Sequence, residues 1–323
     1  MGEFELLARV RERLPPPGGR VRLGSGDDAA VTVPGGATAT SVDALVEGVH
    51  FSRDGTALGQ AGSKALAAAL SDLAAMGAEP GEAYVVLTVP PELDEDACLE
   101  AVDGMVAMAA ATGTTLAGGD VTRGPVLAFA VTVVGHASAP ERFVRRRGAR
   151  PGDALVLTGE LGAAAAGLLL SDLDVPALAA PTAAALLRRQ LEPVPRLAAG
   201  RALAGAGATA MIDVSDGLGA DAGHLAVASE VGLRIDAEAL PVAEGVAELA
   251  AAADRDPLQL AVSGGEDYEL LAAVPPQGLD LPRLGEAAGV GMTLIGEVVA
   301  GEGVEIRLPG GRTLESSGFD QLG

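Results

Sequence analysis

The sequence predicts a two-domain protein that mixes strands and helices, an α/β or α+β architecture. Its length of 323 residues suggests two domains or one large one. Hydrophobic residues make up 49% of the chain against 20% charged residues, which is enough for a sizeable core and excludes a wholly disordered chain. Short apolar strand patterns also alternate with longer helical patterns along the chain.

The first half contains strand patterns separated by helical ones. The amphipathic segment at residues 1–14 carries charges throughout, so it predicts a helix and not a signal peptide. Apolar alternation or continuous apolar runs predict strands at residues 29–33, 37–42, 83–89, 115–117 and 126–134. The longer apolar stretches predict helices at residues 57–77 and 94–112.

A polar segment at residues 136–153 interrupts this pattern. It contains three consecutive arginines and a Pro-Gly turn, which are typical of a connection. We therefore expect one domain at residues 1–138 and a second at residues 139–323.

The second half repeats the mixture of strands and helices. Strands are predicted at residues 154–158, 209–214, 233–236, 259–262 and 269–274. Helices are predicted at residues 161–170, 182–191 and 196–204 and after Gly217, while Pro193 and Pro195 separate two of them. Residues 275–312 give only a weak pattern.

The charge and the cysteine content limit the partners and the compartment. Acidic residues outnumber basic residues by 44 to 22, a net charge of −22 that repels nucleic acid and anionic membrane surfaces. We therefore expect neither as a partner. Cys98 is the single cysteine, so no disulfide can form within the chain. These features favour a cytoplasmic protein.

Small acidic turns are the most informative feature of the sequence. Asp43, Asp120 and Asp213 each follow an apolar run, and the ends of strands commonly project binding groups. Each turn taken alone is also ordinary turn chemistry, because Asp accepts from backbone amides and Gly tolerates positive φ. The clusters lie at residues 24–28, 41–43, 71–72, 118–120, 213–217 and 264–267.

Carboxylates that converge would require cations. Two carboxylates about 4 Å apart repel by about 4 kcal/mol at an effective dielectric constant of about 20. Oxygen ligands favour Mg²⁺ or Ca²⁺, and Mg²⁺ often joins carboxylates to substrate phosphates. The sequence contains no P-loop, protein-kinase motif or G-x-S-x-G motif. A nucleotide-binding enzyme and a non-enzymatic acidic protein that binds divalent cations both remain open.

The motifs taken together resemble the thiamine-monophosphate kinase family. The resemblance extends from residue 2 to residue 320 and rests on residues 27–30, 43–51, 70–78, 118–124, 213–218 and 264–270. It implies the two-domain fold of the aminoimidazole-ribonucleotide synthetase superfamily, with mixed sheets covered by helices. It further implies an N-terminal domain that binds ATP and Mg²⁺ and forms a homodimer, and a C-terminal domain that completes the nucleotide and substrate site. The implied reaction is a direct in-line transfer from ATP to thiamine monophosphate, giving thiamine diphosphate and ADP.

The resemblance also implies roles for individual residues. The Mg²⁺ ligands would be Asp28, Ser41, Val42 through its carbonyl oxygen, Asp43, Asp72, Asp120, Asp213 and Asp216. ATP would contact Gly119, Asp120, Arg146 and Ser215. Thiamine monophosphate would contact His50, Glu266 and Phe319, whose ring would stack on the cationic heterocycle. No general base is assigned, because the acceptor phosphate is already ionised.

Each of these residues also has a structural interpretation. His50 would then stabilise a turn, Arg146 would lie in a solvated linker, Glu266 would cap a turn, and Phe319 would anchor the C-terminus to the core.

The sequence departs from the family pattern at several positions. Val42 and Val121 stand where the family usually has Thr, and Ala69 stands where it usually has Asn. Residues 319–322 lack the usual His-Phe ending, which leaves open an enzyme of the same superfamily with another acceptor. A selenophosphate synthetase is disfavoured, because its nucleophilic Cys is expected near the N-terminal Gly-rich segment, whereas Cys98 lies in a helical pattern.

Overall fold

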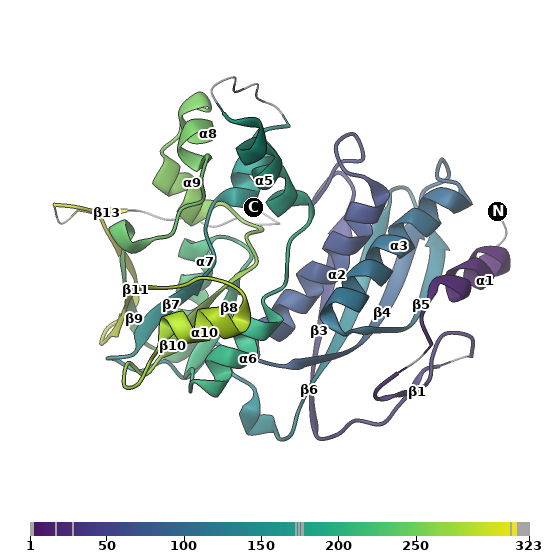
Figure 1. The fold of residues 1–323 in the computed structure, drawn as a ribbon, viewed down its shortest axis with the longest axis horizontal. Coiled ribbons are helices and arrows are strands. Elements are labelled where there is room, and N and C mark those ends of the chain that lie inside the picture. Colours follow the sequence, from purple (N-terminus) through teal and green to yellow (C-terminus); the bar gives the residue numbers. More distant parts are fainter. Residues whose placement is uncertain are drawn as a thin grey trace. The chain divides into compact units, whose positions relative to one another are not determined.

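The computed structural model describes residues 3–16, 18–27, 29–171, 173, 175, 178–310 and 312–314. The chain divides into two compact units (Figure 1). Unit 1 comprises Met1–Leu73 and Ala78–Arg142, and unit 2 comprises Ala74–Gly77 and Phe143–Gly323. Both units contain a mixed sheet and helices, so the predicted two-domain architecture is confirmed.

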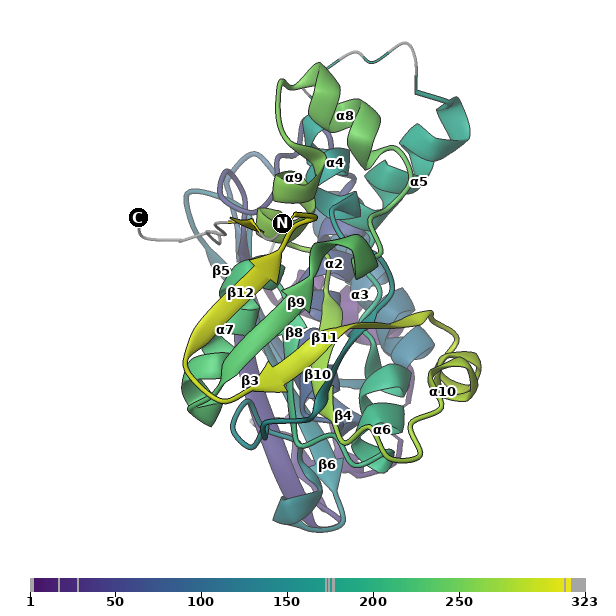
Figure 2. The same ribbon diagram turned by 90° about the vertical axis from the view of Figure 1, so that its left-hand side faces the viewer.

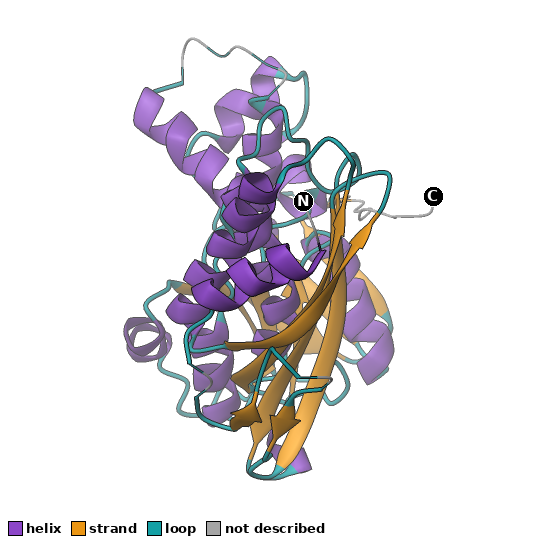
Figure 3. Cartoon of the chain, turned by 90° about the vertical axis from the view of Figure 1, so that its right-hand side faces the viewer, coloured by secondary structure: helices purple, strands orange, loops and turns teal. Residues whose placement is uncertain are grey.

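Unit 1 is built on a four-stranded sheet with the order β3-β6-β4-β5. The pairs β3–β6 and β6–β4 are antiparallel, and β4–β5 is parallel. Helices α2 and α3 lie over one face of this sheet (Figure 3). The elements are α1 (Glu3–Arg13), β1 (Val21–Leu23), β2 (Val31–Thr32), β3 (Ala37–Val46), α2 (Leu58–Ala75), β4 (Glu79–Val89), α3 (Glu95–Thr112), β5 (Thr115–Arg123) and β6 (Ala128–Ala137).

The two long helices of unit 1 pack closely because glycines face backbone at their contact. A Cβ on Gly62 of α2 would lie 1.9 Å from the carbonyl oxygen of Ala101, and a Cβ on Gly104 of α3 would lie 1.8 Å from that of Gly59. The Asp94 carboxylate caps α3 by accepting from the Ala97 N–H at 2.9 Å. This packing fixes α2, which carries Asp72.

The two faces of the unit 1 sheet differ in burial. Along β3, odd-numbered side chains are buried or half-buried and even-numbered side chains are mostly exposed. Val42, on the second face, is 68% exposed. Within the described residues, β3 and β5 are each hydrogen-bonded to one neighbouring strand only. Unit 1 therefore presents a partly apolar face and two long sheet edges.

Unit 2 contains a seven-stranded sheet with the order β13-β12-β9-β11-β7-β10-β8 (Figure 2). Among the described strands of this sheet, only β12 and β9 form a parallel pair. Every residue of β7, β8 and β10 is buried, as expected for strands covered on both faces. The strands are β7 (Ala154–Thr158), β8 (Ala210–Val214), β9 (Gly232–Asp236), β10 (Glu269–Val274), β11 (Met292–Val299), β12 (Gly303–Arg307) and β13 (Thr313–Leu314).

The helices of unit 2 contribute to two hydrophobic cores. Helix α7 packs on the sheet, and its buried Leu218, Ala222, Leu225 and Ala226 belong to the main core. A second, smaller core joins α4, α5, α8 and α9 through apolar residues such as Leu186, Val246 and Leu249. The helices are α4 (Ala163–Leu169), α5 (Ala180–Leu191), α6 (Leu197–Gly205), α7 (Leu218–Ser229), α8 (Val246–Ala252), α9 (Pro257–Ser263) and α10 (Leu281–Ala288).

Two sequence predictions of secondary structure are wrong. Residues 259–262 belong to helix α9 and not to a strand, because Asp256 accepts from the Gln259 N–H at 2.9 Å and Pro257 occupies the first turn. Asp43, Asp120 and Asp213 lie within strands β3, β5 and β8 and not after them. None of the helices in the described ranges combines the length and apolar character needed to cross a bilayer.

Candidate active site

In unit 1, the predicted ligands of β3 and α2 converge. The Ser41 hydroxyl donates a hydrogen bond to the Asp72 carboxylate. Asp43 lies two residues further along β3, so its side chain faces the same side of the sheet. The Asp43 Oδ1 accepts from the Ala44 N–H at 2.8 Å. These three side chains supply only oxygen donors.

Asp120 does not join this group within one chain. Strands β6 and β4 separate β3 from β5, so three strand spacings of about 4.8 Å place Asp43 and Asp120 about 14 Å apart. The ladder aligns Asp43 with Val131, Val85 and Gly119, whereas Asp120 is aligned with Val86 in the next row. Asp43 and Asp120 therefore lie on opposite faces, and they cannot hold one ion within a single copy.

Gly119 is required by the sheet itself. A Cβ at this position would lie 2.0 Å from the carbonyl oxygen of Val85 on β4. Close approach of two strands therefore explains this glycine independently of any nucleotide.

His50 lies in the turn after β3 with a fixed ring. The ring Nδ1 accepts from the Val46 N–H at 3.0 Å, and the backbone N–H of His50 donates to the Val46 carbonyl oxygen at 2.9 Å. Because Nδ1 is an acceptor, the neutral ring carries its proton on Nε2. The half-buried ring can thus present a hydrogen-bond donor.

In unit 2, the predicted residues Asp213, Ser215 and Asp216 lie at the end of β8 and in the turn that leads to α7. Asp213 is buried, while Ser215 and Asp216 are half-buried. The Asp221 Oδ2, from the first turns of α7, accepts from the N–H groups of Ser215 and Asp216, each at 3.0 Å. One carboxylate oxygen therefore orients the turn that carries two of the predicted ligands.

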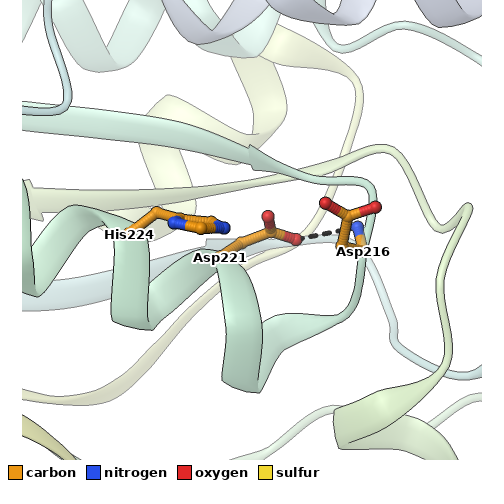
Figure 4. Close-up of side chains that lie close together, drawn as sticks. All are labelled: Asp216, Asp221 and His224. Carbon is orange, nitrogen blue, oxygen red and sulfur yellow. Dashed lines mark hydrogen bonds between the residues drawn. The ribbon is translucent and has the colours of Figure 1, made fainter. Parts of the chain in front are cut away.

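Asp221 is 3% exposed. Burial, followed by the nearby Asp213 carboxylate, raises the pKa of Asp221 to about 7. His224 follows it by three residues on α7, and Asp216, Asp221 and His224 place one ligand atom each within 4.8 Å of one another (Figure 4). This arrangement concentrates metal-binding groups around Asp216.

Glu266 lies in the segment that precedes β10. Its N–H donates to the Ser215 carbonyl oxygen at 2.8 Å, so it is joined directly to the β8–α7 turn. Glu266 adopts a left-handed backbone with φ of 67°. Glu266 is half-buried, and the hydrogen bond places its backbone beside the predicted nucleotide residue Ser215.

Arg146 lies alongside the beginning of β8. The Met211 N–H donates to the Arg145 carbonyl oxygen at 3.0 Å, and the Ser229 hydroxyl donates to that of Arg146 at 2.8 Å. The backbone of Arg146 is therefore fixed while its side chain is exposed.

Three other predicted residues offer no side-chain ligand within the described part of the chain. Asp28 and Phe319 lie outside the described residues. The Val42 side chain points to the exposed face and has no ligand atom, so only its carbonyl oxygen could bind a cation.

Sequence reasoning missed two buried carboxylates, Asp221 and Asp267. Asp267 accepts from the Gly162 N–H at 2.7 Å and from the Ala164 N–H at 3.2 Å. Asp267 stands inside the Gly-Gly-Glu-Asp cluster that the sequence analysis identified, but its burial depends on residues more than 100 positions away. Asp221 follows Asp216 by five residues, a spacing without a distinctive pattern.

Comparisons with known proteins identify the family of the chain. The family model described as AIR synthase related protein, N-terminal domain, matches residues 26–137, and the corresponding C-terminal domain matches residues 150–309. The thiamine-monophosphate kinase of Salmonella typhimurium is 40% identical over 304 residues, 93% of this chain and 91% of that protein. The Escherichia coli K12 protein of the same name is 41% identical over 306 residues, with the same coverage of 93% and 91%.

The chain belongs to the thiamine-monophosphate kinase family. The resemblance predicted from the motifs is thereby confirmed.

Solved structures support the same relationship. The crystal structure of thiamine-monophosphate kinase from Stenotrophomonas maltophilia K279a has a TM-score of 0.84 and 37% identity, covering 95% of this chain and 96% of that one. A structure described as AaThiL complexed with AMPPCP and TMP has a TM-score of 0.77 and 33% identity, covering 87% and 86%. The E. coli hydrogenase maturation protein HypE, at 21% identity and a TM-score of 0.77, shares the fold.

Proposed function

We propose that this protein transfers a phosphoryl group from ATP to thiamine monophosphate, forming thiamine diphosphate and ADP. The observation that supports this most is the 40% identity with a thiamine-monophosphate kinase over 93% of the chain. The relative AaThiL has been captured with TMP and with AMPPCP, an ATP analogue whose terminal phosphate is not transferred. A chain rich in carboxylate oxygens also agrees with this reaction, because these oxygens can bind the cations that offset the charge of two phosphate-bearing substrates.

The residues present fit a magnesium site. The proposed ligands supply carboxylate, hydroxyl and carbonyl oxygens, the donor class that Mg²⁺ prefers. Ser41 and Asp72 already meet in unit 1, and Asp213 and Asp216 flank one turn in unit 2. When bound, Mg²⁺ would offset the negative charge of both substrates and of the transition state. The proposed ligands are Asp28, Ser41, Val42 through its carbonyl oxygen, Asp43, Asp72, Asp120, Asp213 and Asp216.

The transfer is proposed to be direct and in line. An oxygen of the thiamine monophosphate phosphate forms a bond to the γ-phosphorus as the bond from that phosphorus to the ADP oxygen breaks. That acceptor oxygen is ionised near neutral pH, so the chain need not supply a general base.

Separate residues are proposed to position the two substrates. Gly119, Asp120, Arg146 and Ser215 are assigned to ATP. For thiamine monophosphate, the Nε2 of His50 offers a donor and the Glu266 carboxylate offers a negative charge to a cationic heterocycle. Phe319 is assigned to the same substrate.

A homodimer formed through unit 1 is part of the proposal. The described sheet leaves β3 and β5 as edges, and these edges carry Asp43 and Asp120. Pairing β3 of one copy with β5 of a second would place the strand that bears Asp43 about 4.8 Å from the strand that bears Asp120 of that copy, instead of about 14 Å within one copy. The half-exposed face with Val42 and Val86 would be covered in such a dimer.

A cytoplasmic location is also proposed, because the reaction consumes ATP and the chain's single cysteine is a free, buried thiol. The strongly acidic chain offers no support for nucleic acid or an anionic membrane as partner.

A product assay tests the proposed reaction. The protein is incubated with ATP, Mg²⁺ and a panel of phosphorylated acceptors, and the products are separated by chromatography, with ATP alone as the control. We expect equal amounts of thiamine diphosphate and ADP, and turnover with thiamine monophosphate only. Turnover with a different acceptor would point to another activity of the superfamily. Calorimetry showing metal binding that is indifferent to ATP, with no ADP formed, would favour a cation-binding protein.

A further inference from the structure

The segment before β10 is held in an unfavourable backbone conformation. Glu266 has φ of 67° and Tyr268 has φ of 50°, and both are non-glycine residues in the left-handed region. Asp267 lies between them. Such conformations persist only where surrounding contacts determine them, and they are concentrated at functional sites.

Backbone hydrogen bonds hold one side of this segment. The Glu266 N–H donates to the Ser215 carbonyl oxygen at 2.8 Å, and the Tyr268 N–H donates to that of Val214 at 2.9 Å. The ladder between β8 and β10 then begins with Glu269 opposite Val214. The segment is therefore joined along its length to the turn that bears Ser215 and Asp216.

The Asp267 carboxylate holds the other side. It is 4% exposed, and each of its oxygens accepts one amide: Oδ2 from Gly162 at 2.7 Å and Oδ1 from Ala164 at 3.2 Å. Because each oxygen accepts from a different amide, an Asn side chain would leave one of the two amides facing an NH₂ group.

Two arginines surround the neighbouring carboxylate. Glu269, fully buried, accepts from Arg196 at 2.6 and 2.8 Å, from Arg189 at 2.6 Å and from the Thr158 hydroxyl at 2.7 Å. Asp267 and Glu269 are therefore buried in unit 2, whereas Glu266, which precedes them, is half-buried. Burial raises the pKa of Asp267 to about 7, because a charged carboxylate is disfavoured away from water.

We propose that Asp267 is a positioning residue that acts through Glu266 to set the orientation of the phosphorylated, cationic acceptor. By joining the strained segment to the amides of Gly162 and Ala164, Asp267 fixes the left-handed backbone of Glu266 and the direction of its side chain. The inference rests on the proposed function, in which Glu266 contacts thiamine monophosphate.

The primary test is the variant Asp267→Asn. Its amide keeps one acceptor oxygen but places an NH₂ group against the second backbone N–H, so the segment is held on one point only. We expect KM for thiamine monophosphate to rise about tenfold, with KM for ATP and kcat changing by less than about threefold. Equal increases in both KM values would overturn the proposal.

Asp153→Asn is a matched control. Asp153 is also a buried carboxylate of unit 2, and its Oδ2 accepts from the Arg150 N–H at 2.9 Å and the Thr209 hydroxyl at 2.6 Å. The substitution removes a buried carboxylate from the same unit and leaves the contacts of residues 264–268 unchanged. We expect neither KM to change, and a rise in KM for thiamine monophosphate would show that general loosening of unit 2 produces the effect.

A double-mutant cycle tests whether Asp267 acts through Glu266. In the background Glu266→Gln, adding Asp267→Asn should raise KM for thiamine monophosphate by less than about twofold, because the positioned carboxylate is already absent. Full additivity of the two effects would contradict the proposal.

Hydrogen exchange provides a readout that does not require activity. Peptides covering residues 264–268 should exchange at least about tenfold faster in Asp267→Asn than in the wild type or in Asp153→Asn, because the Glu266 N–H loses its fixed geometry. Unchanged exchange would overturn the inference even if the wild type is active. If Asp267→Asn exchanges faster but the wild type has no kinase activity, the positioning contact stands and the proposed function is rejected.

Discussion

The pH dependence of stability should reveal the buried carboxylate of Asp267. The perturbation is Asp267→Asn, which replaces a group that ionises with one that does not. Burial raises the pKa of Asp267 from 3.8 to about 7, against the opposing effect of the amides of Gly162 and Ala164. Arg189 and Glu269 are the charged groups that act on it, with Arg189 lowering and Glu269 raising its pKa.

The sign and size follow from linkage. Because the folded-state pKa is raised, the stability due to this group is fully present below pH 3.8 and is lost as the pH rises to about 7. At about 1.36 kcal/mol per pH unit, the full loss is about 4 kcal/mol, of which about 2–3 kcal/mol falls between about pH 5 and about pH 8. In the variant, the Gly162 or the Ala164 N–H loses its acceptor, which lowers the free energy of unfolding by the same amount at about pH 5 and at about pH 8.

Urea unfolding of both proteins measures this difference. The free energy of unfolding of the variant, relative to the wild type, should increase by about 2–3 kcal/mol from about pH 5 to about pH 8. A metal-free buffer with chelator is used, because cation binding to the folded protein would itself change the free energy of unfolding. If the two stability curves run parallel across this range, Asp267 does not titrate there and the reasoning about its burial fails.

Three further predictions follow from single contacts. Asp221→Ala should lose about 2 kcal/mol or more of unfolding free energy, because two amides lose their acceptor, whereas Asp221→Asn keeps the single oxygen that both use; equal losses in urea unfolding would contradict this. Gly119→Ala should cost about 1–3 kcal/mol because its Cβ would meet the Val85 carbonyl oxygen, while the control Gly223→Ala, with open space around it, should be neutral or stabilising; thermal unfolding compares them. Asp43→Asn and Asp120→Asn should each be inactive alone, yet an equal mixture refolded together should recover about a quarter of wild-type turnover. Half of the dimers in that mixture would contain one copy of each variant, and one of the two sites in such a dimer would keep both aspartates. No recovery would contradict a site shared between copies.

Local sequence patterns predict an element of the fold correctly where the spacing of its apolar residues matches the faces that are buried in the structure. The strand at residues 154–158 coincides with β7, Ala154–Thr158, because a continuous apolar run of that length suits a strand buried on both faces. Residues 259–262 are wrongly predicted as a strand because their three apolar residues, Leu260, Ala261 and Val262, fit either a helix or a strand. Asp256 and Pro257 shortly before them carried the helix signal.

The carboxylates of the candidate site were visible in the sequence, but their environments were not. Asp43 interrupts an apolar pattern, which predicts a strand end, although strand β3 continues through Val46. Asp267 became distinct only through contacts with Gly162 and Ala164, which are distant in sequence. Burial and charge coupling depend on tertiary packing, so a single sequence reveals the residue type at a site but not its pKa or its partners.

The central claim is that these aspartates hold Mg²⁺ for transfer between two phosphates. Thiamine diphosphate formation should be measured against Mg²⁺ concentration for the wild type, Asp216→Asn and the control Asp153→Asn, with circular dichroism to verify folding. We predict turnover that vanishes in chelator for the wild type and the control, and at least about a hundredfold lower turnover for Asp216→Asn at saturating Mg²⁺. Undiminished turnover in chelator, or in folded Asp216→Asn, would contradict the account.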